Sequence, residues 1–164
     1  MIDLPNLRPK VEDIARTAGH SLRTQQATFS QERVSLKSLN ALVSDVDKNA
    51  EELLVAALSN LLPEAGFLTE EGTVGQNTNT DYYWVIDPLD GTTNFVHGLP
   101  IFSVSIALMH RNEPVLGVVY EVGLDECFSA IKDGGTTLNG DAVHTSSTTE
   151  LKDSLLATGF PYYD

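Results

Sequence analysis

The sequence predicts an α+β fold in which two N-terminal helices are layered on a mainly antiparallel sheet. Two long segments with helical spacing of apolar residues come first, and several short apolar segments separated by turn residues follow them. No repeat, low-complexity tract or linker divides the 164 residues, which suffice for one domain of ordinary size. Helices followed by a run of strands favour helices packed on one sheet.

The first predicted helix extends from Leu7 to about Ser30. Pro9 lies near its start, where a missing N–H costs nothing. Its apolar residues follow helical spacing at Val11, Ile14, Ala15, Ala18 and Leu22. The next segment, Lys37–Val43, is short and mixed in character, and we expect it to be extended or to form a hairpin.

The second predicted helix begins at a cap formed by Ser44 or Asp45 and stops at Pro63 and Gly66. One apolar stripe runs along it, formed by Val46, Ala50, Leu53, Leu54, Ala57, Leu58, Leu61 and Leu62. This stripe is the strongest helical signal in the chain, and we expect it to face the sheet.

Short apolar segments in the remainder of the chain predict strands. Residues 72–81, rich in Gly, Asn and Thr, form a loop, and tight turns are expected at Arg111–Pro114, Asp133–Gly135 and Asn139-Gly140. The second predicted strand ends at Asp87, because Pro88 has no N–H for a ladder. We expect strands at Phe67–Thr69, Tyr82–Ile86, Ile101–His110, Val115–Glu121, Glu126–Lys132 and Leu155–Thr158.

The charge balance is strongly acidic, with 10 Lys plus Arg against 23 Asp plus Glu and a net charge of −13. Such a surface repels nucleic acid and anionic membranes, and it repels phosphorylated metabolites unless a bound cation reverses the local sign. The single cysteine, Cys127, rules out an internal disulfide and reads as a small buried side chain. Without a signal peptide or a membrane span in the sequence, we expect a cytoplasmic protein.

Two carboxylates follow the second predicted strand in "WVIDPLDGTTNF", at Asp87 and Asp90. Gly91 allows a close backbone approach there, and Thr92 opens what reads as a short helix whose free N–H groups can bind an anion. Neighbouring carboxylates repel each other unless a proton or a cation lies between them. Oxygen ligands that include the Leu89 carbonyl suit Mg²⁺ better than zinc.

Further acidic residues lie after another predicted strand and at the start of the second predicted helix. Glu70 and Glu71 read either as a solvated loop pair or as a second acidic site, and Asp47 reads either as a helix-capping charge or as a third. Asp87 and Asp90 by themselves also fit a turn with an aspartate cap. The combination with Gly-Thr behind it favours a site, and the chain has no G-x-S-x-G, P-loop or H-E-x-x-H motif that would indicate other chemistry.

The stretch "WVIDPLDGTTNFVHGLP" resembles the signature of the inositol monophosphatase family of Mg²⁺-dependent, lithium-sensitive phosphatases. The segments "LVSDVDKNAEELL", "FLTEEG", "GVVYEV", "GGTTLNG" and "LLATGFPYYD" resemble the family in the same order, so the resemblance covers nearly all of the chain from Lys37 onward. One departure is the run Ala41-Leu42-Val43-Ser44, where the family usually has "DLVT". The implied fold is the N-terminal half of the sugar-phosphatase αβαβα sandwich.

The resemblance also implies a role for individual residues. Glu70, Asp87 and the carbonyl of Leu89 would bind a first Mg²⁺, Asp87 and Asp90 a second, and Asp47 with Glu70 a weaker third. The catalytic residues would be Glu70, Thr92 and Asp47, with Thr92 and Glu70 orienting and deprotonating the attacking water.

The same carry-over places the substrate. The amides of Gly91 and Thr92 would hold the phosphate, and Asp90 would also meet a substrate hydroxyl. Lys37 and Glu71 are further possible site residues. The expected reaction is hydrolysis of a phosphate monoester, first of all myo-inositol monophosphate, by a metal-activated water.

The family's chain continues for roughly another hundred residues, with a "WD-x-A-A-G" segment that completes the second metal site. This sequence stops at Asp164, so we expect residues 1–164 to be an N-terminal metal-binding domain without its C-terminal half. We expect this chain to be weakly active or inactive by itself, and to form a homodimer. The alternatives are a non-catalytic metal- or protein-binding module, or a phosphatase of nucleotide 3′-phosphates or fructose 1,6-bisphosphate.

Overall fold

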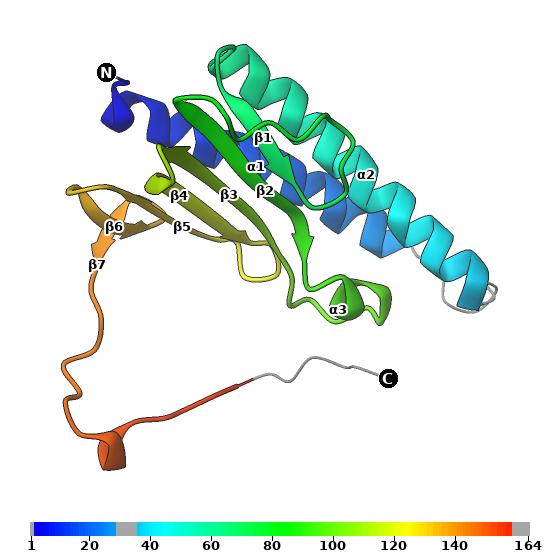
Figure 1. The fold of residues 1–164 in the computed structure, drawn as a ribbon. Helices are drawn as coiled ribbons and strands as arrows, with labels where there is room; N and C mark the ends of the chain where they lie inside the picture. The colour runs from blue at the N-terminus through cyan, green and yellow to red at the C-terminus, as the bar shows by residue number, and fades with distance from the viewer. Residues whose placement is uncertain (1, 29–35, 159–164) are drawn as a thin grey trace.

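The computed structural model describes residues 2–28 and 36–158, and for residues 36–44 it describes the backbone only. Two long helices and a seven-stranded sheet form its body (Figure 1). The elements are α1 (Leu4–Thr28), α2 (Leu36–Leu61), β1 (Gly66–Thr69), β2 (Tyr82–Asp90), α3 (Thr92–Val96), β3 (Ser103–His110), β4 (Glu113–Glu121), β5 (Glu126–Ile131), β6 (Gly135–Leu138) and β7 (Asp141–Val143).

The strands follow one another across the sheet in sequence order, from β1 to β7. β1 pairs with β2 in parallel, and every later pair is antiparallel. α1 packs on β3, β4 and β5, and α2 packs beside it on β2, so both helices cover the same face of the sheet (Figure 1). The predicted α+β arrangement of two helices on a mainly antiparallel sheet is confirmed.

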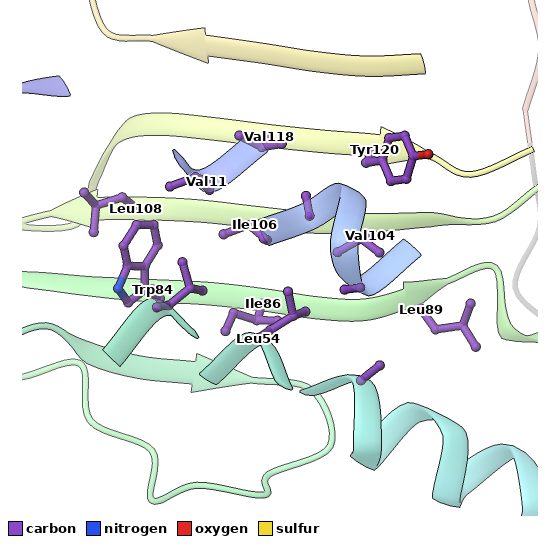
Figure 2. Close-up of a cluster of buried hydrophobic side chains, with 14 of the residues drawn as sticks. Val11, Leu54, Trp84, Ile86, Leu89, Val104, Ile106, Leu108, Val118 and Tyr120 are labelled. Atoms are coloured by element: carbon purple, nitrogen blue, oxygen red, sulfur yellow. The ribbon is translucent and has the colours of Figure 1, made fainter. Parts of the chain in front are cut away.

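Alternation along the strands builds the core between the helices and this face (Figure 2). Ile86 pairs with Ile106 and Ile106 with Val118, and all three side chains are buried. Leu54 of α2 and Val11 of α1 point toward them from the helix side. Each large apolar side chain buried in this way contributes about 1.5–3 kcal/mol. The other buried residues labelled there are Trp84, Leu89, Val104, Leu108 and Tyr120.

Close packing of α1 against β4 depends on a glycine. A Cβ at Gly19 would lie 2.5 Å from Cε1 of Tyr120, which is closer than two non-bonded carbon atoms can approach. The Tyr120 hydroxyl donates a hydrogen bond to Asp125 Oδ1 at 2.8 Å. Cys127 is buried in β5 as expected, and this burial raises its pKa to about 11.

Three expectations about the elements are wrong. Residues Lys37–Val43 belong to α2 instead of an extended segment, so Ser44 and Asp45 lie inside the helix and do not cap it. The reason is visible in the sequence, because Leu36, Leu39, Val43, Val46 and Ala50 continue the helical spacing toward the N-terminus.

The second expectation concerns β2, which continues past Asp87 to Asp90. Its register against β3 shifts between Asp87 and Asp90. Pro88 therefore lies in an irregular stretch, where the strand does not need a backbone N–H from it to pair with β3. The third is the strand at Leu155–Thr158, where the structure assigns none. Residues 144–158 are exposed and run away from the sheet (Figure 1). The final "GFPYYD" lies outside the described residues.

Candidate metal and phosphate site

An acidic corner, formed by Asp47, Glu70, Glu71, Asp87 and Asp90, lies where β1 and β2 end. Because these two strands are parallel, their carboxyl ends meet at the same edge of the sheet. Thr69 pairs with Ile86, and the Glu70 N–H donates to the Ile86 carbonyl at 3.2 Å, so Glu70 and Asp87 follow at neighbouring positions. The sheet topology therefore brings together acids that lie far apart in the sequence.

Asp87 is half-buried among other acids. Burial raises its pKa to about 7, together with a hydrogen bond and charge from Glu70 and the charge of Asp90. The Leu89 N–H donates to Asp87 Oδ1 at 3.1 Å and opposes this rise. Neighbouring carboxylates repel each other, so this arrangement favours a proton or a cation at Asp87.

Asp47 belongs to the same corner but comes from α2. Its side chain is only 6% exposed, and its Oδ1 has no hydrogen-bond partner within the described part of the chain. Burial raises the pKa of Asp47 to about 7, followed by the charges of Glu71, Glu70, Asp87 and Glu51. The helix-capping interpretation of Asp47 is therefore wrong, because the residue lies well inside α2 and faces the other acids.

The phosphate side of the site is built from Gly91 and α3. Gly91 has a φ of 98°, and a Cβ on it would lie 3.0 Å from the Ile101 carbonyl oxygen, so this position requires glycine. α3 begins at Thr92 as predicted, and the N–H groups of its first turn have no acceptors inside the helix. The Thr92 hydroxyl donates to the Leu89 carbonyl at 3.0 Å, so the start of α3 is tied to the end of β2 that carries Asp87 and Asp90.

Asp90 and Glu70 are exposed at the rim, and Asp90 Oδ2 accepts a hydrogen bond of 3.4 Å from the Ser103 hydroxyl. Glu71 is half-buried, and burial raises its pKa, together with the charges of Glu51 and Glu70. Lys37 lies near the start of α2, and its side chain is outside the described part of the chain.

A buried acid that the sequence analysis did not single out supports this corner from α2. Glu51 is 0% exposed and accepts hydrogen bonds from the loop that follows β1. Burial alone would raise the pKa of Glu51, but hydrogen bonds from Thr73 and Glu71 outweigh it and keep the pKa below its ordinary value. A signal did exist, since Glu51 occupies the helical spacing 47, 51, 54, 58 on a buried face, where an acid needs partners.

The oxygen donors of the corner are of the kind that a hard divalent cation binds. Among residues 2–28 and 45–158, no three His, Cys, Asp or Glu side chains stand close enough together to hold a metal ion. Repulsion between like charges favours such separation. The unpartnered Asp47 Oδ1 and the raised pKa values of Asp47 and Asp87 are what a cation would relieve, and carboxylate and carbonyl oxygens are its preferred ligands.

Comparison with known proteins assigns the chain to a family. Residues 6–164 match the sequence profile of the Inositol monophosphatase family. The chain is 37% identical over 148 residues to an inositol-1-monophosphatase of Mesorhizobium japonicum, covering 90% of this chain and 56% of that protein. It is 38% identical over 148 residues to the Nus factor SuhB of Escherichia coli, covering 90% and 55%.

The fold has the same relatives. The structure of an inositol monophosphatase from Anabaena (Nostoc) sp. superimposes with a TM-score of 0.77 at 31% identity, over 92% of this chain and 53% of that one. The chain thus spans about half the length of the relatives it matches. In the described part of the chain, no helix is long and apolar enough to cross a membrane. The chain belongs to the inositol monophosphatase family.

Proposed function

We propose that the protein is a Mg²⁺-dependent phosphatase of small phosphorylated polyols, with myo-inositol monophosphate as its first candidate substrate. The observation that carries the proposal is the acidic corner, in which the buried Asp47 keeps an unpartnered oxygen near Glu70, Glu71 and Asp87. Asp87 in turn lies near Asp90. Membership of the family and the name of the Mesorhizobium relative support the reaction class.

The metal-holding residues follow from the family resemblance and from the donors present. Glu70, Asp87 and the Leu89 carbonyl would hold one Mg²⁺, Asp87 and Asp90 a second, and Asp47 with Glu70 a third. When bound, the ions supply the positive charge that a phosphate needs near a protein of net charge −13, and they make a nearby water more acidic.

The reacting water would be handled by Thr92 and Glu70. The Thr92 hydroxyl donates its hydrogen bond to the Leu89 carbonyl. The lone pairs of its oxygen therefore remain available to accept a hydrogen bond from water. Glu70, exposed at the rim, would accept the proton that the water loses when it attacks phosphorus. The first-turn amides at Gly91 and Thr92 would bind the phosphate oxygens, and Asp90 would accept a hydrogen bond from a substrate hydroxyl.

Further properties of the protein belong to this proposal. Residues 1–164 would act as the N-terminal metal-binding domain, and this stretch alone would be weakly active or inactive, because it spans about half the length of its relatives. A homodimer, lithium sensitivity and a cytoplasmic location are proposed from the family resemblance. The acidic charge disfavours nucleic acid as a direct partner.

The proposal is tested by measuring phosphate release from inositol 1-phosphate by the whole protein, with and without Mg²⁺. We expect release that depends on Mg²⁺ and is abolished by Asp90→Asn, because an amide is a poor ligand for a hard cation. Nucleotide 3′-phosphates and fructose 1,6-bisphosphate serve as competing substrates. Absence of Mg²⁺-dependent release from all three refutes the phosphatase, and Mg²⁺ binding without turnover would identify a non-catalytic module.

A further inference from the structure

A carboxylate on α2 holds the loop that follows β1. Glu51 Oε2 accepts the Glu71 N–H at 2.7 Å, and Glu51 Oε1 accepts both the N–H and the hydroxyl of Thr73, each at 2.7 Å. The acid has no exposed surface. All three donors lie within three residues of Glu70, so one buried side chain fixes the backbone beside an acid of the corner.

The residue on the other side of Glu70 is also fixed. The Thr69 N–H donates to Gln76 Oε1 at 2.9 Å, and Gln76 Nε2 donates to the Thr69 carbonyl at 3.2 Å. The Glu70 N–H itself donates to the Ile86 carbonyl at 3.2 Å. Both neighbours of Glu70 are therefore anchored, and the anchor on the Glu71 side is Glu51.

The chemistry of this anchor requires a carboxylate. In the described part of the chain Glu51 forms no ion pair with Lys or Arg, so its charge is balanced by hydrogen-bond donors alone. Two oxygens can accept three bonds, whereas a glutamine amide offers one acceptor and turns two N–H donors toward the N–H groups of the loop. The isosteric replacement Glu51→Gln should therefore release part of the loop.

We propose that Glu51 is a positioning residue for metal binding, which holds the Glu70–Thr73 backbone so that Glu70 faces Asp47 and Asp87. This inference rests on the proposed function, since it assumes that Glu70 is a metal ligand. Glu51 touches neither the ion nor the substrate, and it acts through the loop. Residues that orient metal ligands in this way change metal affinity by about 10–100-fold when they are replaced.

The test compares Mg²⁺ affinity, measured by calorimetric titration, among four forms of the protein. These are the unsubstituted protein, Glu51→Gln, the neighbouring exposed Glu52→Gln, and Tyr120→Phe, which removes a hydrogen bond remote from the corner. Backbone amide hydrogen exchange at Glu71 and Thr73 is followed in the metal-free protein. The titration reports metal binding and the exchange reports the anchor, so the two readouts are independent.

We expect Glu51→Gln to weaken Mg²⁺ binding by about 10–100-fold and to speed exchange at both amides, whereas Glu52→Gln and Tyr120→Phe bind Mg²⁺ as the unsubstituted protein does. A folded Glu51→Gln protein with unchanged affinity would overturn the inference, as would equal losses in Tyr120→Phe. If Glu51→Gln does not fold, Thr73→Val removes only the hydroxyl bond, and unchanged affinity there overturns it as well.

The two proposals fail separately. An unsubstituted protein that binds no Mg²⁺ refutes the proposed function. In that case amide protection at Glu71 and Thr73 that survives Glu51→Gln refutes the anchor on its own. Mg²⁺ binding that is present in the unsubstituted protein and unaltered by Glu51→Gln leaves the proposed function standing and removes Glu51 from it.

Discussion

Two successive turns of α2 each carry a buried acid, and the protein treats them in opposite ways. Glu51 accepts three hydrogen bonds, and its pKa lies below the ordinary value. Asp47, four residues earlier on the same face, keeps an oxygen without a partner, and its pKa is raised to about 7. Burial penalises the charge in both cases, so the supply of donors decides the sign.

The difference separates an acid that the fold itself supplies with donors from an acid that, under the proposed function, a cation would stabilise. The loop after β1 donates N–H groups to Glu51, whereas the charges of its carboxylates raise the pKa of Asp47. A carboxylate with enough donors stabilises the fold by itself, whereas a carboxylate among other carboxylates lowers stability until a proton or a metal ion arrives. The acidic corner therefore costs stability that the core must supply, as is common at functional sites.

The largest expected effect comes from removing the satisfied acid. Glu51→Leu leaves the N–H groups of Glu71 and Thr73 and the Thr73 hydroxyl without their acceptor. We expect the free energy of unfolding to fall by about 3 kcal/mol or more, since each buried donor left unpaired costs about 1–3 kcal/mol. Urea denaturation of this variant against exposed Glu52→Leu measures it, and a loss below about 1 kcal/mol would show that water replaces Glu51.

A smaller effect is expected from pH on the metal-free protein. Asp47 and Asp87 have folded pKa values of about 7 against 3.8 for an unperturbed aspartate. Between these values the folded state holds protons that the unfolded state releases, so stability is highest near pH 4, falls as pH rises to 7, and is level above it. We expect most of this fall to come from buried Asp47, because solvent screens the charge of half-exposed Asp87. A stability that rises over pH 4–7 in thermal unfolding would contradict the raised pKa values.

Asp47→Asn should show the opposite sign to Glu51→Leu. Because the amide removes a buried charge from among other acids, we expect the metal-free protein at pH 8 to gain about 1 kcal/mol. The same variant should gain less from added Mg²⁺ than the unsubstituted protein, since stabilisation by a ligand follows its affinity. Melting temperatures with EDTA and with excess Mg²⁺ measure both. A destabilised metal-free variant would mean that Asp47 is as well satisfied as Glu51.

The smallest effect concerns a third buried ionisable group, the thiol of Cys127. Cys127 is 1% exposed, and burial raises its pKa to about 11, so it stays a neutral thiol that needs no charged partner. We expect no reaction with a thiol reagent at pH 8 until the protein is unfolded in guanidinium chloride. Rapid modification of the folded protein would show that this part of the core opens readily.

Much of the fold could be predicted because buried faces place apolar residues at the regular spacing of a helix or a strand. The stripe from Val46 to Leu62 placed α2 on the sheet, and "DPLDGTT" placed two acids and a helix start together. The start of α2 was misjudged because polar residues between Leu36 and Val43 hid a continuing spacing. The strand expected at Leu155–Thr158 has the right residues, but a strand also needs a neighbour, which the sequence does not specify.

The site residues also fell into those that the sequence indicated and one that it did not. Local sequence indicated Asp87, Asp90, Gly91 and Thr92, because they are adjacent in the chain. Glu51 was missed because its partners are backbone N–H groups twenty and twenty-two residues away, and backbone donors leave no mark in a sequence. Its location on a buried helix face was the only available sign.

The parallel pairing of β1 with β2 also makes the two borders of the sheet unequal. The chain must return from the end of β1 to the start of β2, and this return path lies along β1, where the Asn77 N–H donates to the Phe67 carbonyl at 2.8 Å and Gln76 bonds the backbone of Thr69. That border is thus shielded against strand addition from another molecule, whereas β7 forms the opposite border with only three residues. Both borders therefore limit strand pairing between molecules, the first because the returning chain covers it and the second because β7 offers few free backbone groups.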